Sequence, residues 1–499
     1  MGDLPPHSPG VDPGGAAEAA DRVFGTDSAL LAPDPSAPTP APAAPVIALL
    51  APLSGQHAGA GEALLQGAQM ALFDLGNPDA ILLPLDTHGA PDGAARAMRQ
   101  AIEAGAGLAI GPLLAGSVEA VRPIAAQAGI NVVSFSNSPD AAGPPVYLAG
   151  YTPAAQVARI LDAAIAEGRT RIAVLAPSGR YGDAVVAAAQ SVFDGYRTGR
   201  RQPPPEIAAA IAAGRAAPVE PAAGAADALL GLGAARAAPP APVALARLAY
   251  YDPGAADHGE VIRRLSDYDQ RQRALERQRA ELAARDDETA QAALKRLETL
   301  DTLGDPPFDA VLLPALDAQT LKILAAQLAF YDVDEPAVRL LGLQPWDGFA
   351  TLSREPTLIG ARYVATPDDL REQFAARFSA VYERAPSRLA SLAYDVAAVA
   401  VSLAGTEERP SDFGAEALTN PIGFLGAEGL FRFTPDGLNE RGFAVIEITP
   451  AGERIVERAP DRFPPPVSPL QEPPLGEEPP LEEPPLGSAR PLPEAPPAS

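Results

Sequence analysis

Cysteine is absent from the sequence, and several other chemically distinctive residues are scarce. The absence of cysteine excludes a disulfide scaffold, a thiolate metal site, thiol catalysis and a lipid-bearing cysteine for the chain as given. Only 38 residues are Lys or Arg, against 63 Asp or Glu, which gives a formal net charge of -25. Nucleic acids and anionic membranes require a positive protein surface, so this charge argues against both as partners.

Long apolar runs are missing as well. No segment reaches the roughly 18 apolar residues of a spanning helix, so we expect no transmembrane segment. The first apolar run, Val46–Ala51, is followed by Pro52 and Gly55 and predicts a buried strand. Residues 1–45 form a leader rich in proline and alanine that has neither a signal peptide nor a lipobox. We expect this leader to be disordered, and expect either a cytoplasmic protein or a start that lacks its export signal.

Catalytic patterns are also lacking. The four histidines are His7, His57, His88 and His258, and none forms a His-x-x-x-His pair or has a carboxylate at metal-ligand spacing. The glycines at 179–182 do not match a phosphate-binding loop. The sequence therefore predicts a protein that is not an enzyme and that holds neither a metal nor a cofactor.

What the sequence does contain is a regular α/β pattern between Val46 and Arg458. Short apolar runs alternate with alanine-rich helical stretches, which predicts parallel sheets covered by helices on both faces. The pattern restarts near Arg171, which predicts two lobes in tandem. We assign residues 46–152 with 352–418 to lobe 1, and 153–351 with 419–458 to lobe 2. Near the end, the runs 429–437 and 443–448 predict a hairpin, because a Pro-Asp-Gly turn ends the first of them and apolar residues alternate with polar ones.

Three further segments interrupt or follow this pattern. Residues 200–242, rich in proline, alanine and glycine, predict a flexible insertion. Residues 260–300 predict a charged helical insertion, either an antiparallel arm that contacts another protein or a solvated helix held by charge pairs. Residues 459–499 form an acidic tail with repeated EPPL units, read as a solvated extended segment or as a ligand for a partner that recognises proline motifs.

Three stretches resemble a known family and one of its subgroups. The run 46–74, with a Pro-x-Ser-Gly turn and the pair Gly67-Ala68, resembles the opening of the type I periplasmic binding proteins, which include leucine receptors. The runs 110–114 and 308–333 are similar to the penicillin-binding protein activators, lipoproteins with the same bilobed domain. The resemblance implies a type I periplasmic-binding-protein fold, with two doubly wound parallel-sheet lobes joined by hinge crossovers.

The resemblance also implies a ligand site. Amino-acid receptors of the family hold a carboxylate with hydroxyls and amides of lobe 1, and an ammonium with an acid of lobe 2. The position expected for that acid is Gln344, whose neutral amide cannot compensate a buried ammonium. We therefore expect weak or no binding of zwitterionic amino acids. The candidate cleft residues are Ser54, Ser117, Ser136, Ser138, Tyr181, Gln344 and Trp346.

Structural roles remain open for several of these candidates. Turn and cap chemistry is an equal alternative for Ser136, Ser138 and Tyr181. Core packing is the alternative for Trp346, the only tryptophan.

The function implied by the closer resemblance is a non-catalytic regulator. It would bind a bifunctional penicillin-binding protein and stimulate peptidoglycan assembly, in the periplasm or at the periplasmic face of the outer membrane. The alternative is a solute-binding receptor of an ABC transporter for amino acids or related small molecules.

Overall fold

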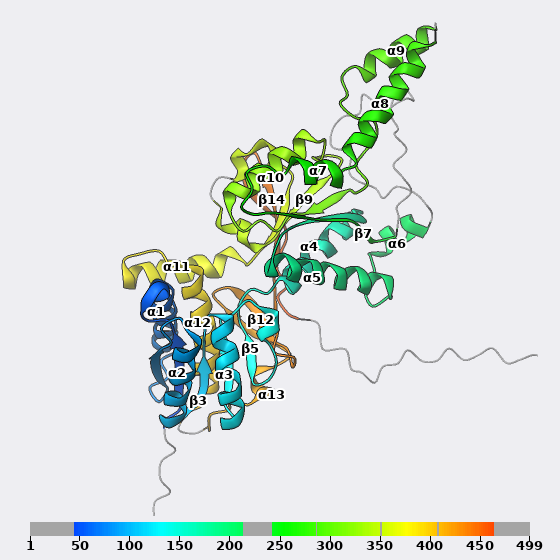
Figure 1. Ribbon diagram of the computed structural model, residues 1–499. Coiled ribbons are helices and arrows are strands. Elements are labelled where there is room, and N and C mark those ends of the chain that lie inside the picture. Colours follow the sequence, from blue (N-terminus) through cyan, green and yellow to red (C-terminus); the bar gives the residue numbers. More distant parts are fainter. Residues whose placement is uncertain (1–43, 213–241, 286, 350–351, 407–408, 464–499) are drawn as a thin grey trace, which may run out of the picture. The chain divides into compact units, whose positions relative to one another are not determined.

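The computed structural model describes residues 44–212, 242–285, 287–349, 352–406 and 409–463 (Figure 1). The leader up to residue 43, the centre of the first insertion and the tail from residue 464 lie outside these ranges. Within the described part of the chain, no helix is both long enough and apolar enough to cross a bilayer.

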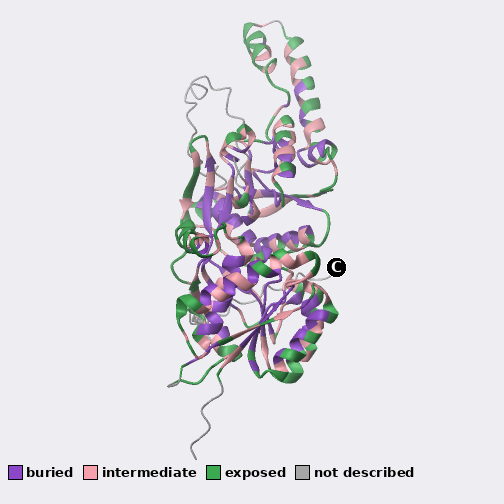
Figure 2. Ribbon diagram, turned by 90° about the vertical axis from the view of Figure 1, so that its left-hand side faces the viewer, coloured by how far each residue is buried: buried purple, intermediate pink, exposed green. Residues whose placement is uncertain are grey.

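Lobe 1 is built on a five-stranded sheet whose strands are all parallel, in the order β2-β1-β3-β4-β5. Alternate residues of β1 face opposite sides, as the two-residue period of a strand requires. Ile47 and Leu49 pack with α1 and α12, whereas Ala48 and Leu50 pack with α2 and α3. The inner strands are therefore buried on both faces, as their apolar runs predict, whereas the edge strand β2 is only partly buried (Figure 2). The elements are β1 (Val46–Ala51), α1 (Ala58–Leu75), β2 (Ile81–Asp86), α2 (Pro91–Glu103), β3 (Ala106–Ile110), α3 (Ala115–Ala128), β4 (Asn131–Ser134), β5 (Val146–Leu148), α11 (Asp368–Tyr382), α12 (Arg388–Leu403) and α13 (Ala415–Leu418).

Lobe 2 is built on a seven-stranded sheet in the order β15-β14-β10-β9-β8-β6-β7. Five of its strands are parallel, and β14 and β15 run antiparallel to their neighbours. Helices α4 and α5 pack against one set of side chains, and α7 and α10 against the other. The elements are α4 (Pro153–Ala166), β6 (Arg171–Pro177), α5 (Arg180–Arg197), α6 (Pro205–Ala212), β7 (Ala244–Tyr251), α7 (Gly259–Leu265), β8 (Ala310–Leu312), α10 (Ala318–Phe330), β9 (Arg339–Gly342), β10 (Arg362–Ala365), β14 (Ala444–Thr449) and β15 (Gly452–Glu457).

We expected residues 352–418 in lobe 1 and residues 419–458 in lobe 2, but the structure divides these segments between the lobes at other positions. Strand β10 lies in the sheet of lobe 2, so the chain passes to lobe 1 only after Thr366. The segment 419–441 forms a small antiparallel sheet of β11 (Phe424–Gly426), β12 (Gly429–Phe433) and β13 (Asn439–Arg441). This sheet packs on the core of lobe 1 through Phe431 and Phe433.

The expected hairpin between 429–437 and 443–448 is wrong in its second strand. Across the Pro-Asp-Gly turn, β12 pairs with β13, and β14 instead pairs with β10 and β15. The reason lies at Asn439, whose buried amide donates to the carbonyls of Leu148 (2.7 Å) and Gly150 (2.8 Å). These bonds hold β13 beside the point where the chain first leaves lobe 1.

The second insertion forms a helical pair, α8 (Tyr268–Ala283) and α9 (Glu288–Leu297), which lie side by side (Figures 1 and 2). Arg279 of α8 donates to the carbonyls of Leu297 (2.6 Å) and Leu300 (2.9 Å), which fixes the pair. At its base, the buried Arg271 donates to the carbonyl of Gly304 (3.0 Å) and to Thr302 (2.7 Å). The antiparallel arm is thus present, and its contact with a partner stays a prediction.

Short 3-10 turns complete the described elements and supply several of the loops at the strand ends. They are η1 (Gly55–His57), η2 (Pro139–Ala141), η4 (Gln344–Gly348), η5 (Leu352–Arg354) and η6 (Pro356–Leu358).

Candidate ligand-binding site

All seven candidate residues lie in segments that follow the carboxyl ends of parallel strands, the edge at which open α/β sheets bind ligands. On the sheet of lobe 1, they follow β1, β3 and β4; on the sheet of lobe 2, they follow β6 and β9. The candidates are Ser54, Ser117, Ser136 and Ser138 in the first group and Tyr181, Gln344 and Trp346 in the second.

Ser54 belongs to a polar cluster with Asp86 and His88, which sequence reasoning did not assemble. The Ser54 hydroxyl lies 2.6 Å from Nδ1 of His88, and Asp86 lies 3.0 Å from the same nitrogen. Burial acts to raise the pKa of Asp86, but hydrogen bonds from Ser54 and from backbone N–H groups outweigh it and lower that pKa. A serine-protease relay needs Ser and Asp on opposite ring nitrogens. These polar contacts therefore hold the loops after β1 and β2 together, and the cluster is not a nucleophilic triad.

The serines after β4 form a chain of local hydrogen bonds. Ser134, fully buried, donates to the carbonyl of Pro112 (2.7 Å) and accepts from the backbone N–H of Ser136 (3.0 Å). Ser136 in turn accepts from the backbone N–H of Ser138 at 3.3 Å. These are the turn bonds that the alternative interpretation describes. Ser117 lies buried in the first turn of α3.

The two aromatic candidates differ in burial. The Trp346 side chain is fully buried and packs on Tyr363, with 6.2 Å between ring centroids. A Cβ at Gly342 would lie 2.3 Å from the Trp346 ring, so only glycine leaves room for the indole. Trp346 thus anchors the η4 turn as core packing and leaves no ring surface for a ligand here. Tyr181 is half-buried, and burial raises the pKa of its hydroxyl.

Gln344, in the same anchored turn, faces a guanidinium. Its side-chain oxygen, in the amide orientation that satisfies both groups, accepts from Arg388 Nε at 2.9 Å and Nη1 at 2.8 Å. Arg388 is the first residue of α12. The position of that helix is fixed by a close approach to α1, because a Cβ at Gly67 would lie 2.0 Å from the Ala390 carbonyl oxygen. Nothing in the sequence announces this contact, since 44 positions separate the two residues.

A carboxylate follows three residues after Gln344. Asp347 is paired through one oxygen with both Arg371 of α11 (2.7 Å) and Arg388. Its side chain is only 7% exposed. The loop after β9 therefore has an acid three residues beyond the position at which we expected its loss, but two residues of the protein already neutralise it.

Arg388 also contacts Glu428, which lies fully buried in the turn between β11 and β12. Nη1 of Arg388 lies 3.2 Å from the Glu428 carboxylate, which further accepts from Thr366 (2.7 Å) and Ser391 (2.5 Å). Burial acts to raise the pKa of Glu428, but the charge of Arg388 and the two hydroxyl hydrogen bonds outweigh it, so the pKa is lowered. Glu428 therefore remains an anion inside the protein.

A second buried pair, Asp395 and Arg441, lies next to it. Asp395 accepts from the backbone N–H groups of Ala427 (2.5 Å) and Glu428 (3.1 Å), with Nη1 of Arg441 at 3.8 Å. Burial raises the pKa of Asp395 to about 7, against the opposing charge of Arg441. Arg441 lies over the Phe431 ring at 4.8 Å, which compensates part of its desolvation.

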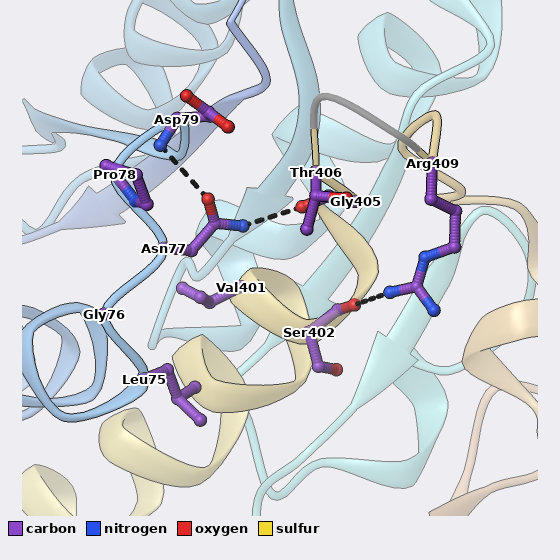
Figure 3. Close-up of a pocket in the computed structure, with 10 residues that line it drawn as sticks. All are labelled: Leu75, Gly76, Asn77, Pro78, Asp79, Val401, Ser402, Gly405, Thr406 and Arg409. Atoms are coloured by element: carbon purple, nitrogen blue, oxygen red, sulfur yellow. Dashed lines mark hydrogen bonds between the residues drawn. The ribbon is translucent and has the colours of Figure 1, made fainter.

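A hollow of about 750 Å³ lies elsewhere (Figure 3). It is lined by the loop after α1, including Asn77 and Asp79, by Ser402 at the end of α12, and by Arg409 in the segment after that helix. These polar groups largely satisfy one another or nearby backbone: Asn77 donates to Gly405 O at 2.8 Å, and Arg409 to Ser402 O at 3.2 Å (Figure 3). None of the seven candidates lines it. Among the residues that the structure describes, no cluster of His, Asp or Glu could hold a metal ion.

Comparison with known proteins agrees with this architecture. Residues 45–260 match the family model described as periplasmic binding protein, which is less than half of the 499-residue chain. No protein with a curated description matches the sequence.

Several solved structures match almost over their full length. One from Rhodospirillum rubrum, assigned to a branched-chain amino acid ABC transporter, has a TM-score of 0.56 at 14% identity and covers 83% of this chain and 100% of its own. An ABC transporter substrate-binding protein from Sphaerobacter thermophilus has a TM-score of 0.52 at 18% identity, with 84% and 98% covered. At such identities the likeness concerns the fold. The chain thus has the type I periplasmic-binding-protein fold, and the match over residues 45–260 supports its resemblance to that family.

Proposed function

We propose that this chain is a non-catalytic, periplasmic solute-binding protein of the kind that delivers a small molecule to an ABC transporter. The observation that carries the proposal is the placement of hydroxyl and amide side chains on loops at the carboxyl ends of strands in both sheets. The solved structures of this fold named above are described as components of ABC transporters, which supports the same function.

A thermal-unfolding screen tests the proposal. A solute that binds the folded state alone adds about 2.7 kcal/mol to stability when present at 100 times its dissociation constant. The screen should contain amino acids, 2-oxo acids, simple carboxylic acids, amides and cell-wall fragments. We expect at least one of these solutes to raise the melting temperature in a concentration-dependent way. A full panel without any shift would argue against a receptor.

A second candidate is the regulator of cell-wall synthesis, and the helical pair α8–α9 is the observation that favours it. This pair is joined to lobe 2 at its base, and it adds a charged surface that ligand binding between two sheets does not require. The partner would be a bifunctional penicillin-binding protein. Pull-down with that synthase should succeed with the full chain and fail when residues 276–297 are replaced by a short Gly-Ser loop. Equal capture, or no capture, of both forms would contradict it.

A further inference from the structure

The loop after β9 carries its own counter-cations. Asp347 and the amide oxygen of Gln344 are the two acceptors that this loop would offer to a positively charged ligand group. Arg388 contacts both of them, and Arg371 contacts Asp347 as well. Both acceptors are therefore already used by residues of the protein.

A ligand ammonium at this loop would be repelled by the positively charged side chains of Arg371 and Arg388. To pair with Asp347 it would have to approach within about 4 Å of two guanidinium groups, each permanently charged at physiological pH. It would also have to displace one of them, because Asp347 is only 7% exposed. If Arg388 were the displaced residue, the fully buried Glu428 would lose its cation, so the cost is largest at Arg388.

We infer that Arg388 serves as the built-in cation of the loop after β9, so that the site accepts solutes without an ammonium group, such as simple carboxylic acids, in preference to amino acids. This inference rests on the proposed receptor function and names its substrate class. Arg388 suits the role because its planar fork reaches several acceptors at once: Gln344, Asp347, Thr366 and Glu428.

Two pairs of probes with matched carbon skeletons test the inference by titration calorimetry. They are L-leucine with 4-methylpentanoate, and L-phenylalanine with 3-phenylpropanoate. In the full chain, we expect the amine-free member of at least one pair to bind ten times more tightly than its amino acid, or better. Tighter binding of the amino acid would overturn the inference while leaving a receptor function intact. Absence of binding by all four probes would also overturn it, and the wider thermal screen would decide separately whether the protein is a receptor.

Variants of Arg388 locate the effect. Arg388→Met frees Gln344 and leaves Asp347 with Arg371 as its single cation, so the affinity ratio should move at least tenfold toward the amino acids. Arg388→Lys keeps one charge but cannot reach all four acceptors, so it should fold more readily and give a smaller shift in the same direction. Arg384→Met removes an exposed arginine paired with Glu62 and should leave the ratio unchanged. An unchanged ratio in a folded Arg388→Lys protein would overturn the role of Arg388.

Discussion

The loop after β4 and the region around Arg388 are both polar, but they achieve polarity by different means. After β4, hydroxyls bond to backbone groups, mostly within two residues along the chain. Around Arg388, charged side chains from distant parts of the sequence meet in the interior, among them Glu428 and the neighbouring Asp395. Local turn bonds depend on one loop, whereas buried charges depend on the whole fold and are costly when one partner is lost. The charged region should therefore respond far more strongly to single substitutions.

The largest effect is expected from Arg441→Met. Removal of this guanidinium, whose side chain is 1% exposed, leaves the buried Asp395 without its cation. We expect a loss of about 3–5 kcal/mol of unfolding free energy, measured by urea denaturation at pH 9, where Asp395 of the wild type is ionised. Arg454→Met is the matched control, because Arg454 is 64% exposed and its pair with Glu447 is worth at most about 1 kcal/mol. Similar losses in the two variants would erase the contrast.

A pH effect from Asp395 should be the next in size. Its pKa is raised in the folded protein to about 7, so the folded state retains a proton that the unfolded chain loses at lower pH. Its stabilising contribution is complete below about pH 4 and is lost as pH rises through 7. The unfolding free energy of the wild type minus that of Asp395→Asn should fall between pH 4 and 7, by at most about 1.4 kcal/mol per pH unit. A pH-independent difference in urea unfolding would refute this protonation.

The smallest effect is expected in the loop after β4. Ser134→Ala removes one hydroxyl and leaves the Pro112 carbonyl and the Ser136 amide without this partner. We expect a loss of about 1–2 kcal/mol of unfolding free energy. Ser138→Ala, which removes a hydroxyl at a partly exposed position, should change stability by less than about 0.5 kcal/mol. A loss at Ser134 as large as that of Arg441→Met would show that turn bonds and buried charges are equivalent here.

Much of the fold could be predicted from the sequence because its signals are local. The apolar run at 46–51 and the helical stretch after it define β1 and α1 without knowledge of their neighbours. Strand pairing, in contrast, depends on residues that lie far apart in the sequence. The alternation at 443–448 fits any antiparallel partner, and only the buried bonds of Asn439 select β13 as the partner of β12.

The candidate site was harder to predict for the same reason. The sequence indicates a neutral Gln344 and expects no acid, yet Asp347 stands three residues away and is neutralised by Arg371 and Arg388. An arginine at the start of an alanine-rich helix carries no sign of its partners, which are supplied by other loops of the fold. Conversely, the sequence left open whether Trp346 was a ligand platform or core, and its complete burial in this structure favours core packing.

The base of the helical pair α8–α9 has a consequence for how this chain can vary. Arg271 closes that base by bonding to Gly304 and Thr302, which flank the return of the chain to lobe 2. The hydrogen bonds that hold the helical pair on lobe 2 thus come from residues at its base and not from the tips of the helices. Shortening, lengthening or exchanging those tips should leave the seven-stranded sheet undisturbed. The length and sequence of the helical tips can therefore vary without a change in the fold of lobe 2.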